Sequence, residues 1–319
     1  MVNVLVTDPL IVDYLDEPDW EVFTHRTDTD VEARLPNTDV LIASRVTESM
    51  AAAATRLRLL HVPGAGLDRI AIDALPPHAT VCNTFHHGRS IAEHVVMVSL
   101  MLARRVLLTD HMLRQGKWVS AAVDPDERPG HTLAGRIVGV VGLGEIGQAV
   151  VRALTTLGMR AQAVRRTPTA PDGLALDRVA DMSGLDDLLS TSDIVVLTVP
   201  LTADTHTMID ARRLALMRRD AVLVNVARGP LVDEDALFDA LSAGRIGGAA
   251  LDVWWGHPKD GAGAKGYTRP FELLDNVVLT PHNSGHTHET FAGRAAEIKA
   301  NVRRLTGGRP LTNVVRPGR

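Results

Sequence analysis

The glycine pattern Gly142-x-Gly144-x-x-Gly147 constrains this chain more than any other feature of its sequence. Residues 137–141 before it are apolar and largely β-branched, which indicates a buried parallel strand. After it, apolar residues recur at helical spacing, and residues 161–164 form a second strand-like run. In a strand–helix–strand unit of about thirty residues this pattern predicts a dinucleotide site. The glycines permit the tight turn, the backbone approach to a pyrophosphate and close helix packing, and the helix N-terminus holds the phosphates.

The residues after the second strand bear on which dinucleotide is bound. Units that bind NAD usually carry Asp or Glu there, for the ribose hydroxyls. Here Arg165, Arg166 and Thr167 follow the strand. Two guanidinium groups and a hydroxyl suit the 2′-phosphate of NADP. We therefore expect an NAD(P)(H) site that favours NADP(H) over NAD(H). The alternative is that these arginines are ordinary surface residues, one of which stacks on the adenine.

Composition limits the classes of function. The chain has 319 residues, enough for two domains, and 45% of them are hydrophobic. A net charge of −4 with scattered arginines argues against a nucleic-acid partner. The single cysteine, Cys82, excludes an internal disulfide, and no apolar run approaches the ~18 residues that span a bilayer. We expect a soluble, cytoplasmic protein with a small-molecule ligand and no membrane partner.

Strand and helix patterns alternate along the chain, which predicts the α/β class with doubly wound parallel sheets. A final helix, expected over Thr287–Leu305, should cross back to the first part of the chain. We therefore predict two Rossmann-like domains with an active-site cleft between them. Residues 1–97 with 287–319 form a discontinuous substrate-binding domain, and residues 98–286 bind the dinucleotide. One long helix over 90–115 is expected either to bridge the domains or to pack against a second subunit.

Three strand ends after the glycine unit carry polar residues: Arg228 within Asn225–Gly229, Asp252, and His282 after Thr280-Pro281. Carboxyl ends of parallel strands meet at one edge of a sheet, where ligands bind. An arginine can grip a carboxylate and polarise the adjacent carbonyl. A histidine can transfer a proton near neutral pH. Each residue alone also fits a structural role, but together they predict a hydride-transfer site.

These segments resemble the D-isomer-specific 2-hydroxyacid dehydrogenase family, which includes glyoxylate/hydroxypyruvate reductases and phosphoglycerate, formate and phosphite dehydrogenases. The resemblance covers nearly the whole chain. It rests on the following segments: Pro63–Asp68, Ile91-Ala92-Glu93-His94, Leu133-Ala134-Gly135, Val199-Pro200-Leu201-Thr202, Asn225–Gly229, Leu251–Val253, and Asn276-Val277 through Thr280-Pro281-His282.

The resemblance implies an NAD(P)-dependent enzyme that interconverts a small 2-keto acid and its D-2-hydroxy acid, usually as a homodimer. It implies that Arg228 binds substrate, that His282 is the acid/base, and that Asp252 holds the nicotinamide amide. N–H groups around Ala65 and Gly66 would hold the substrate carboxylate, although the glycine loop there could also be a plain turn. Arg45 is a further substrate candidate, and the remaining cofactor candidates are Glu145, Ile146, Val199, Pro200, Thr205, Ala227 and Gly285.

The chain departs from the family pattern at His257, where relatives carry a Glu that pairs with the catalytic histidine. A second imidazole stabilises an imidazolium less than a carboxylate does. We expect carbonyl reduction to lose rate at lower pH than in typical members. Formate dehydrogenases also lack this Glu. Two alternatives therefore stay open: oxidation of a small anion such as formate or phosphite, and a non-catalytic nucleotide-sensing interaction protein.

A second departure lies at His87, which with Arg89 could read another acidic or polar group of the substrate. Both residues could equally well lie at the hinge between the domains. His282, His286 and His288 are close in the sequence, but no carboxylate or cysteine completes a ligand set at short range. We therefore expect no metal site.

Overall fold

A computed structural model of the chain describes residues 2–15, 17, 20–22, 31–124, 127, 129–256 and 265–319. The chain divides into two compact units: residues 1–87 with 286–319 form unit 1, and residues 88–285 form unit 2. The first division lies where helix α2 (Gly88–Ala103) begins. The boundary expected between residues 97 and 98 therefore falls inside this helix, whose buried side chains belong to the core of unit 2.

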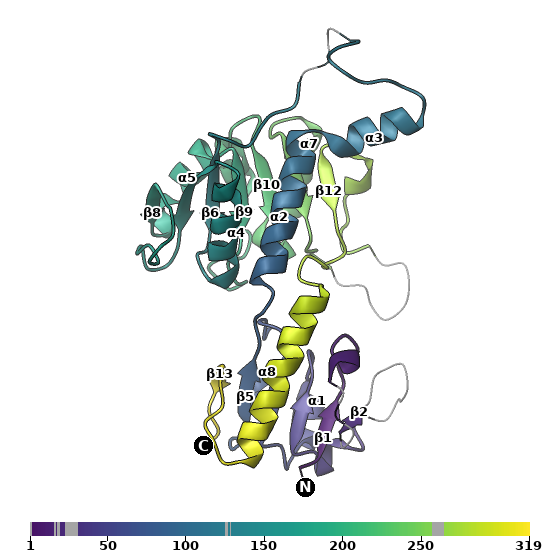
Figure 1. The fold of residues 1–319 in the computed structure, drawn as a ribbon, viewed down its shortest axis with the longest axis vertical. Coiled ribbons are helices and arrows are strands. Elements are labelled where there is room, and N and C mark those ends of the chain that lie inside the picture. The colour runs from purple at the N-terminus through teal and green to yellow at the C-terminus, as the bar shows by residue number, and fades with distance from the viewer. Residues whose placement is uncertain are drawn as a thin grey trace. The chain divides into compact units, whose positions relative to one another are not determined.

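Unit 1 is built on a six-stranded sheet in the order β13-β5-β4-β3-β1-β2. All its pairings are parallel except that of β13 with β5. The long helix α8 runs alongside these strands (Figure 1). The elements are β1 Val4–Val6, β2 Glu21–Val22, β3 Val40–Ile42, α1 Glu48–Ala53, β4 Leu59–Val62, β5 Thr80–Asn83, α8 His288–Thr306 and β13 Val314–Arg316, with short 3-10 turns at Val12–Tyr14, Leu35–Asn37 and Ile72–Ala74.

Alternate residues of these strands fill two separate cores. Leu41 and Leu60 belong to the core that includes Ala51 of α1, whereas Ile42 and Leu59 pack with Ile298 of α8. Because the strands are buried on both faces, they read as continuous apolar runs. The predicted α/β class with doubly wound parallel sheets is confirmed.

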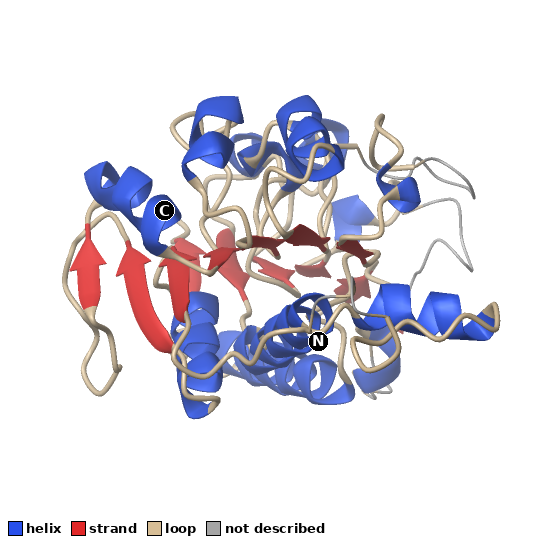
Figure 2. Ribbon diagram, turned by 90° about the horizontal axis from the view of Figure 1, so that it is seen from above, coloured by secondary structure: helices blue, strands red, loops and turns tan. Residues whose placement is uncertain are grey.

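Unit 2 is built on a seven-stranded parallel sheet in the order β12-β11-β10-β9-β6-β7-β8. Helices lie on both sides of the strands (Figure 2). Besides α2, the elements are α3 Val106–Arg114, β6 Ile137–Val141, α4 Glu145–Thr156, β7 Arg160–Val164, β8 Arg178–Ala180, α5 Leu185–Thr191, β9 Ile194–Leu197, α6 Ala211–Leu216, β10 Val222–Asn225, α7 Glu234–Ser242, β11 Gly248–Leu251 and β12 Val277–Leu279, with 3-10 turns at Met182–Gly184, Gly229–Leu231 and Phe271–Leu273.

The two faces of this sheet are again covered by different helices. Val138 and Val140 of β6 belong to one core with α2 and α4, whereas Val141 belongs to the opposite core with α5, α6 and α7. Among the described helices, none is both long and apolar enough to cross a membrane.

The single helix expected over residues 90–115 is wrong: the chain forms α2 and α3, which are separated at Arg104 and Arg105. Arg105 adopts a left-handed backbone with φ 53°. The Ala103 carbonyl accepts a hydrogen bond from the His131 N–H at 2.9 Å, and a Cβ on Gly130 would lie only 2.9 Å from the same oxygen. The helix ends because a distant segment returns to cap it, and neither Gly nor Pro marks the position.

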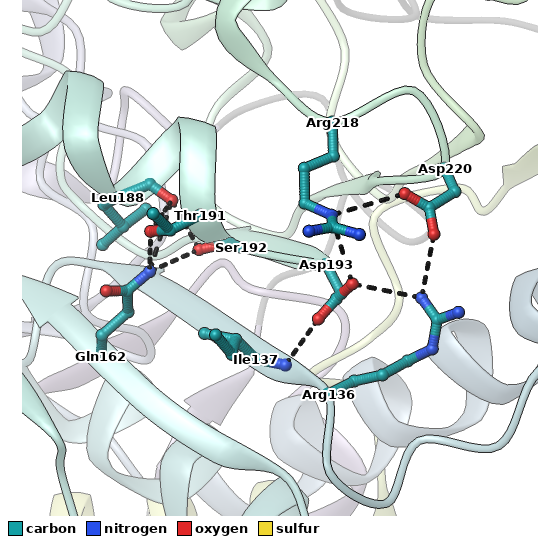
Figure 3. A network of polar contacts seen from close by, with 9 residues as sticks. All are labelled: Arg136, Ile137, Gln162, Leu188, Thr191, Ser192, Asp193, Arg218 and Asp220. Atoms are coloured by element: carbon teal, nitrogen blue, oxygen red, sulfur yellow. Dashed lines mark hydrogen bonds and ion pairs between the residues drawn. The ribbon is translucent and has the colours of Figure 1, made fainter.

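The amino-terminal ends of the central strands of unit 2 are joined by charged side chains (Figure 3). Asp193, which is 9% exposed, accepts a hydrogen bond from the Ile137 N–H at 2.8 Å. Arg136 lies 3.2 Å from Asp193 and 3.3 Å from Asp220, and Arg218 lies 3.5 Å from both carboxylates. Two arginines and two aspartates thus neutralise one another across β6, β9 and β10. We call this set the amino-edge network.

Candidate functional site

The carboxyl ends of β10, β11 and β12 bring the three predicted residues to one edge of the sheet. Asn225, Leu251 and Leu279 are register partners in these neighbouring parallel strands. Arg228 and His282 each lie three residues beyond their partner, and Asp252 follows Leu251 directly. Arg228 and His282 therefore occupy equivalent positions on two loops that flank the loop of Asp252.

The loop of Arg228 is shaped by the Asn225 side chain. The Asn225 amide accepts from the Ala227 N–H at 3.1 Å and donates to the Arg228 carbonyl at 2.8 Å. Arg228 is half-buried, and its Nη1 donates to the Ala227 carbonyl at 2.7 Å. A Cβ on Gly229 would collide with the backbone of Trp254, so only glycine allows this loop to pack on the loop after β11.

The Asp252 carboxylate is 1% exposed and accepts hydrogen bonds from the loop after β12. Its Oδ1 accepts from the Thr280 hydroxyl at 2.6 Å and the Asn283 N–H at 3.0 Å. Its Oδ2 accepts from the Ser284 N–H at 3.0 Å and from the Ser284 hydroxyl. The charge of Asp252 is thus stabilised by four uncharged donors within the protein.

His282 lies at the centre of this loop and is exposed. Its backbone adopts a left-handed conformation with φ 59°, which residues other than glycine rarely adopt. Strained backbone of this kind persists only where surrounding contacts fix it, and it is common at functional sites. The contacts here are those from Thr280, Asn283 and Ser284 to Asp252.

His94 on α2 feels the charge of Asp252. Burial lowers the pKa of His94, and the negative charge of Asp252 partly opposes this shift. The resemblance includes His94 in a matching segment but gave it no role.

The glycine turn between β6 and α4 fits a dinucleotide. Gly142 has φ +96°, and a Cβ on Gly147 would collide with the Gly142 carbonyl oxygen. A Cβ on Gly144 would instead meet no described atom within 4 Å, so open space lies at the start of α4. No side chain caps this helix at Gly144. The N–H groups and the dipole of a helix start favour a phosphate at this position.

The other cofactor candidates of unit 2 lie mostly in loops after the strands of the same sheet. Arg165 donates from Nη1 to the Thr169 carbonyl at 2.9 Å, whereas Arg166 and Thr167 are exposed after β7. The Thr205 hydroxyl donates to the Pro200 carbonyl at 2.8 Å and so holds its own turn. The rest lie at loop or helix starts: Glu145 and Ile146 in the first turn of α4, Val199 after β9, Ala227 after β10, and Gly285 beyond the His282 loop.

The substrate candidates belong to unit 1. Arg45 is exposed after β3, and Ala65 and Gly66 lie in the loop after β4. The Asn83 side chain donates to the Ala65 carbonyl at 3.0 Å and holds that loop. His87 is 6% exposed, and its Nδ1 lies 2.6 Å from the Phe85 carbonyl. The predicted catalytic residue His257 lies outside the described residues.

Sequence reasoning missed the residues that connect these loops. The Trp254 indole N–H donates to the Thr280 carbonyl at 3.1 Å, and its ring centroid lies 4.9 Å from that of Tyr267. Ser284 supplies two of the donors to Asp252. The signal in the sequence was Trp254 itself, because an indole has an N–H that can donate a hydrogen bond.

Comparisons with known proteins identify the family of this chain. Residues 96–284 match the family model described as "D-isomer specific 2-hydroxyacid dehydrogenase, NAD binding domain". A glyoxylate reductase of Thermococcus onnurineus is 35% identical over 290 residues, which cover 87% of this chain and 84% of the relative. A D-3-phosphoglycerate dehydrogenase of Methanocaldococcus jannaschii is 32% identical over 326 residues, covering 99% of this chain and 59% of the relative.

The chain thus spans about three fifths of the length of that phosphoglycerate dehydrogenase. Among solved structures, a D-isomer specific 2-hydroxyacid dehydrogenase from Xanthobacter autotrophicus in complex with NADPH and MES is 29% identical. It superimposes with a TM-score of 0.78 over 98% of each chain. These matches confirm the resemblance stated from the sequence, and the chain belongs to the D-isomer specific 2-hydroxyacid dehydrogenase family of oxidoreductases.

Proposed function

We propose that this protein interconverts a small 2-keto acid and its D-2-hydroxy acid with NAD(P)(H). The observation that carries the proposal is the equivalent placement of Arg228 and His282 after β10 and β12. Both residues lie at the same edge of the parallel sheet as the Gly142–Gly147 turn, where ligands of such sheets bind. The open space at Gly144, at the start of α4, supports a bound dinucleotide.

A dinucleotide held at the Gly142–Gly147 turn would supply the hydride for reduction of the keto carbon and would accept it in the reverse direction. Arg228 would bind the substrate carboxylate with two hydrogen bonds and stabilise the negative charge that develops on the keto oxygen. His282 would donate a proton to that oxygen during reduction and remove it during oxidation. Keto acid, reduced cofactor and one proton thus give hydroxy acid and oxidised cofactor.

For the cofactor, we propose a preference for NADP(H). Arg166 and Thr167 are exposed after β7, where the ribose of a bound dinucleotide lies, and no carboxylate occupies this position. Arg165 already donates to the Thr169 carbonyl, so Arg166 is the better candidate for the 2′-phosphate. The NADPH held by the relative from Xanthobacter autotrophicus supports this proposal.

For the substrate, we propose that the N–H groups of Ala65 and Gly66 help to bind its carboxylate. Arg45 and His87 would contribute to recognition of the rest of the substrate. The bond from Asn83 to the Ala65 carbonyl supports a preformed loop. The buried contact of His87 with Phe85 favours an indirect role for this histidine.

The test is a panel of glyoxylate, hydroxypyruvate, phenylpyruvate and branched 2-keto acids with NADPH and with NADH, followed by absorbance at 340 nm. We expect turnover with at least one keto acid and a higher kcat/KM for NADPH. His282→Gln should lower kcat by about 10²- to 10⁴-fold, and Arg166→Ala should lower kcat/KM for NADPH but not for NADH.

Reduction of NAD(P)+ by formate or phosphite alone would favour the small-anion alternative. Tight cofactor binding without any turnover would favour a nucleotide sensor.

We also propose a homodimer through the face formed by α2 and α3. Its large apolar side chains are exposed to solvent, which is unusual for a monomer surface: Met97, Leu100, Val106, Leu107, Leu113 and Trp118. In Figure 1, α3 projects from the body of unit 2. Sedimentation velocity should give the dimer mass for the unaltered chain and the monomer mass for Leu113→Glu. A monomer at every concentration of the unaltered chain would contradict the proposal.

A further inference from the structure

We propose that His86 and Glu297 are positioning residues that hold the chain where it leaves unit 1, and thereby confine the joint between the two units to the start of α2. The chain passes between the units twice, after His87 and after Gly285, and we call these places the first and the second passage. Movement of one domain against another is absorbed by a few residues at such places. The inference rests on the proposed function, in which residues of both units bind the substrate.

The chain before the first passage is bound to helix α8. His86 Nε2 lies 2.7 Å from Oε2 of Glu297, and the Thr290 hydroxyl donates to the His86 carbonyl at 3.3 Å. Arg294 Nε donates to the Phe85 carbonyl at 3.3 Å. Because α8 begins soon after the second passage, these contacts tie the chain at the two passages together inside unit 1. The segment before the first passage is therefore held as a part of unit 1.

His86 has a backbone conformation that needs such support. Its φ is 60°, in the left-handed region that residues other than glycine rarely adopt. The imidazole packs so closely on α8 that a Cβ on Gly293 would lie 2.7 Å from its Nδ1. One helix thus fixes both the side chain and the backbone of His86. Contacts of this kind stabilise a strained residue, and their loss lets the backbone move to other angles.

The chain after the first passage is also closely packed. Gly88 is the first residue of α2 and is buried. A Cβ at this position would lie 3.2 Å from Cγ of Glu145, in the first turn of α4. The start of α2 is therefore held against the helix that begins at the dinucleotide turn. With both sides held, bending at this passage falls on the few backbone bonds that join His87 to Gly88.

Release of His86 would lengthen the flexible part of the first passage. Each freed residue adds conformations that the protein must lose when both units bind the substrate. The state that can bind substrate is then populated less, and the apparent affinity falls by the same factor. Cofactor binding should not change, because the candidate cofactor residues all belong to unit 2. The expected signature is therefore a higher KM for the keto acid with an unchanged Kd for NADPH.

Asn313 provides a matched control for His86. It also has a left-handed backbone, with φ 52°, and its side chain donates to Oε1 of the same Glu297. It directly precedes β13 and is not part of either passage. His86→Gly and Asn313→Gly each remove one contact of Glu297 at a residue whose φ glycine adopts readily. Only the first substitution acts on the chain between the units.

The experiment compares the two variants with the unaltered chain by hydrogen exchange of residues 84–90, steady-state kinetics, cofactor titration and melting temperature. We expect small and similar changes in melting temperature. His86→Gly should speed exchange of residues 84–90 and raise the KM for the keto acid, each about three- to tenfold, the equivalent of one hydrogen bond. Its kcat and its Kd for NADPH should stay within about twofold of the unaltered values. Asn313→Gly should change neither the exchange nor the KM.

Glu297→Ala removes the same contact from the helix side and should reproduce the rise in KM. Equal KM values in His86→Gly and Asn313→Gly would overturn the inference, and so would unchanged exchange of residues 84–90 in His86→Gly. A higher Kd for NADPH in His86→Gly, with the KM for the keto acid retained, would overturn it as well. If the unaltered protein turns over no keto acid, the proposed function fails, and the exchange measurements still decide whether His86 holds the first passage.

Discussion

The two edges of the seven-stranded sheet in unit 2 hold charge in opposite ways. At the amino edge, Arg136, Arg218, Asp193 and Asp220 pair with one another. At the carboxyl edge, the charge of Asp252 is held by hydroxyl and backbone donors, and no described atom fills the space at Gly144. The amino edge is complete by itself, whereas the carboxyl edge is arranged around positions that a ligand can occupy.

The pKa of Asp220 illustrates what the amino edge contributes. Burial raises this pKa, but a backbone hydrogen bond and the guanidinium groups of Arg218 and Arg136 outweigh burial and hold it below its ordinary value. The network thus stabilises the ionised carboxylate of Asp220, and this stabilisation is lost only as the pH falls into the acidic range. Charge pairing of this kind secures the amino-terminal ends of the strands, whereas the loops at the opposite ends include the strained backbone of His282.

The largest expected difference between the edges concerns activity. Arg228→Met removes a guanidinium from the carboxyl edge and should lower kcat/KM for the keto acid by about 10²- to 10³-fold, because the developing oxyanion loses its stabilisation. The melting temperature should change little, since Arg228 is half-buried and the loop is held by Asn225. Steady-state kinetics and calorimetry check this. A variant with a clearly lowered melting temperature and an unchanged kcat/KM would contradict this prediction, because Arg228 would then contribute to stability and not to activity.

Substitutions at two glycines of the Gly142–Gly147 turn should affect stability and cofactor binding differently. Gly147→Ala should cost more than about 3 kcal/mol of unfolding free energy, because the obstructing atom is the backbone oxygen of Gly142. Gly144→Ala places its methyl in open space and should stay within about 1 kcal/mol of the unaltered chain. The same variant should weaken NADPH at least about tenfold by occupying the approach of the pyrophosphate. Urea denaturation and cofactor titration measure the two effects, and equal effects of both substitutions would contradict this division.

The pH dependence of the free energy of unfolding also has a contribution from unit 1. His61 is fully buried, and burial lowers its pKa from 6.5 to about 4. The unfolded chain protonates this residue below pH 6.5 while the folded chain does not, so stability is lost as pH falls from 6.5 towards 4. The loss is on the order of 3 kcal/mol at most.

The check on His61 is the free energy of unfolding of the unaltered chain and of His61→Gln at pH 7.5 and pH 5. Gln can still accept the hydrogen bond that the Asn301 amide now makes to His61 at 3.0 Å. The variant should show a flatter dependence on pH in this window. Parallel profiles would mean that the acid sensitivity arises elsewhere, and the amino-edge network would then be the first place to look.

The smallest effect is expected for the counterpart of the arginine substitution at the amino edge. Arg218→Met should leave kcat/KM unchanged and lower the unfolding free energy by less than about 1 kcal/mol, because its contacts to Asp193 and Asp220 are long and partly exposed. Comparison with Arg228→Met isolates location, since the same side chain is removed in both. Kinetics and urea denaturation are sufficient for this test.

Much of unit 2 could be predicted because its signals are local. The apolar run of β6, the glycine turn and the periodicity of α4 follow one another within a single stretch, and each strand after it ends in a recognisable polar residue. Strand β5 and the edge strand β13 were not predicted. Thr80–Asn83 is short and ends in a polar residue, and the side chains of Val314 and Val315 are exposed. Their pairing depends on partners far away in the sequence.

The contacts that organise the site were also beyond local reasoning. The sequence places Asp252, Thr280 and Ser284 near the ends of two strands, but only the register of β11 with β12 makes one carboxylate the acceptor for a whole loop. The break between α2 and α3 has the same origin, since the atom that ends α2 comes from residue 131. In each case a tertiary contact overrides a pattern that reads differently by itself.

The bond between Ala103 and His131 means that the segment carrying α3, which is part of unit 2, begins and ends at one place in that unit. A segment whose ends already meet can be shortened, lengthened or exchanged at small entropic cost, because the closure is made by the residues that remain. The same sheet could thus accept different modules at this position, each presenting its own surface to the surroundings while the strands and the dinucleotide turn stay as they are.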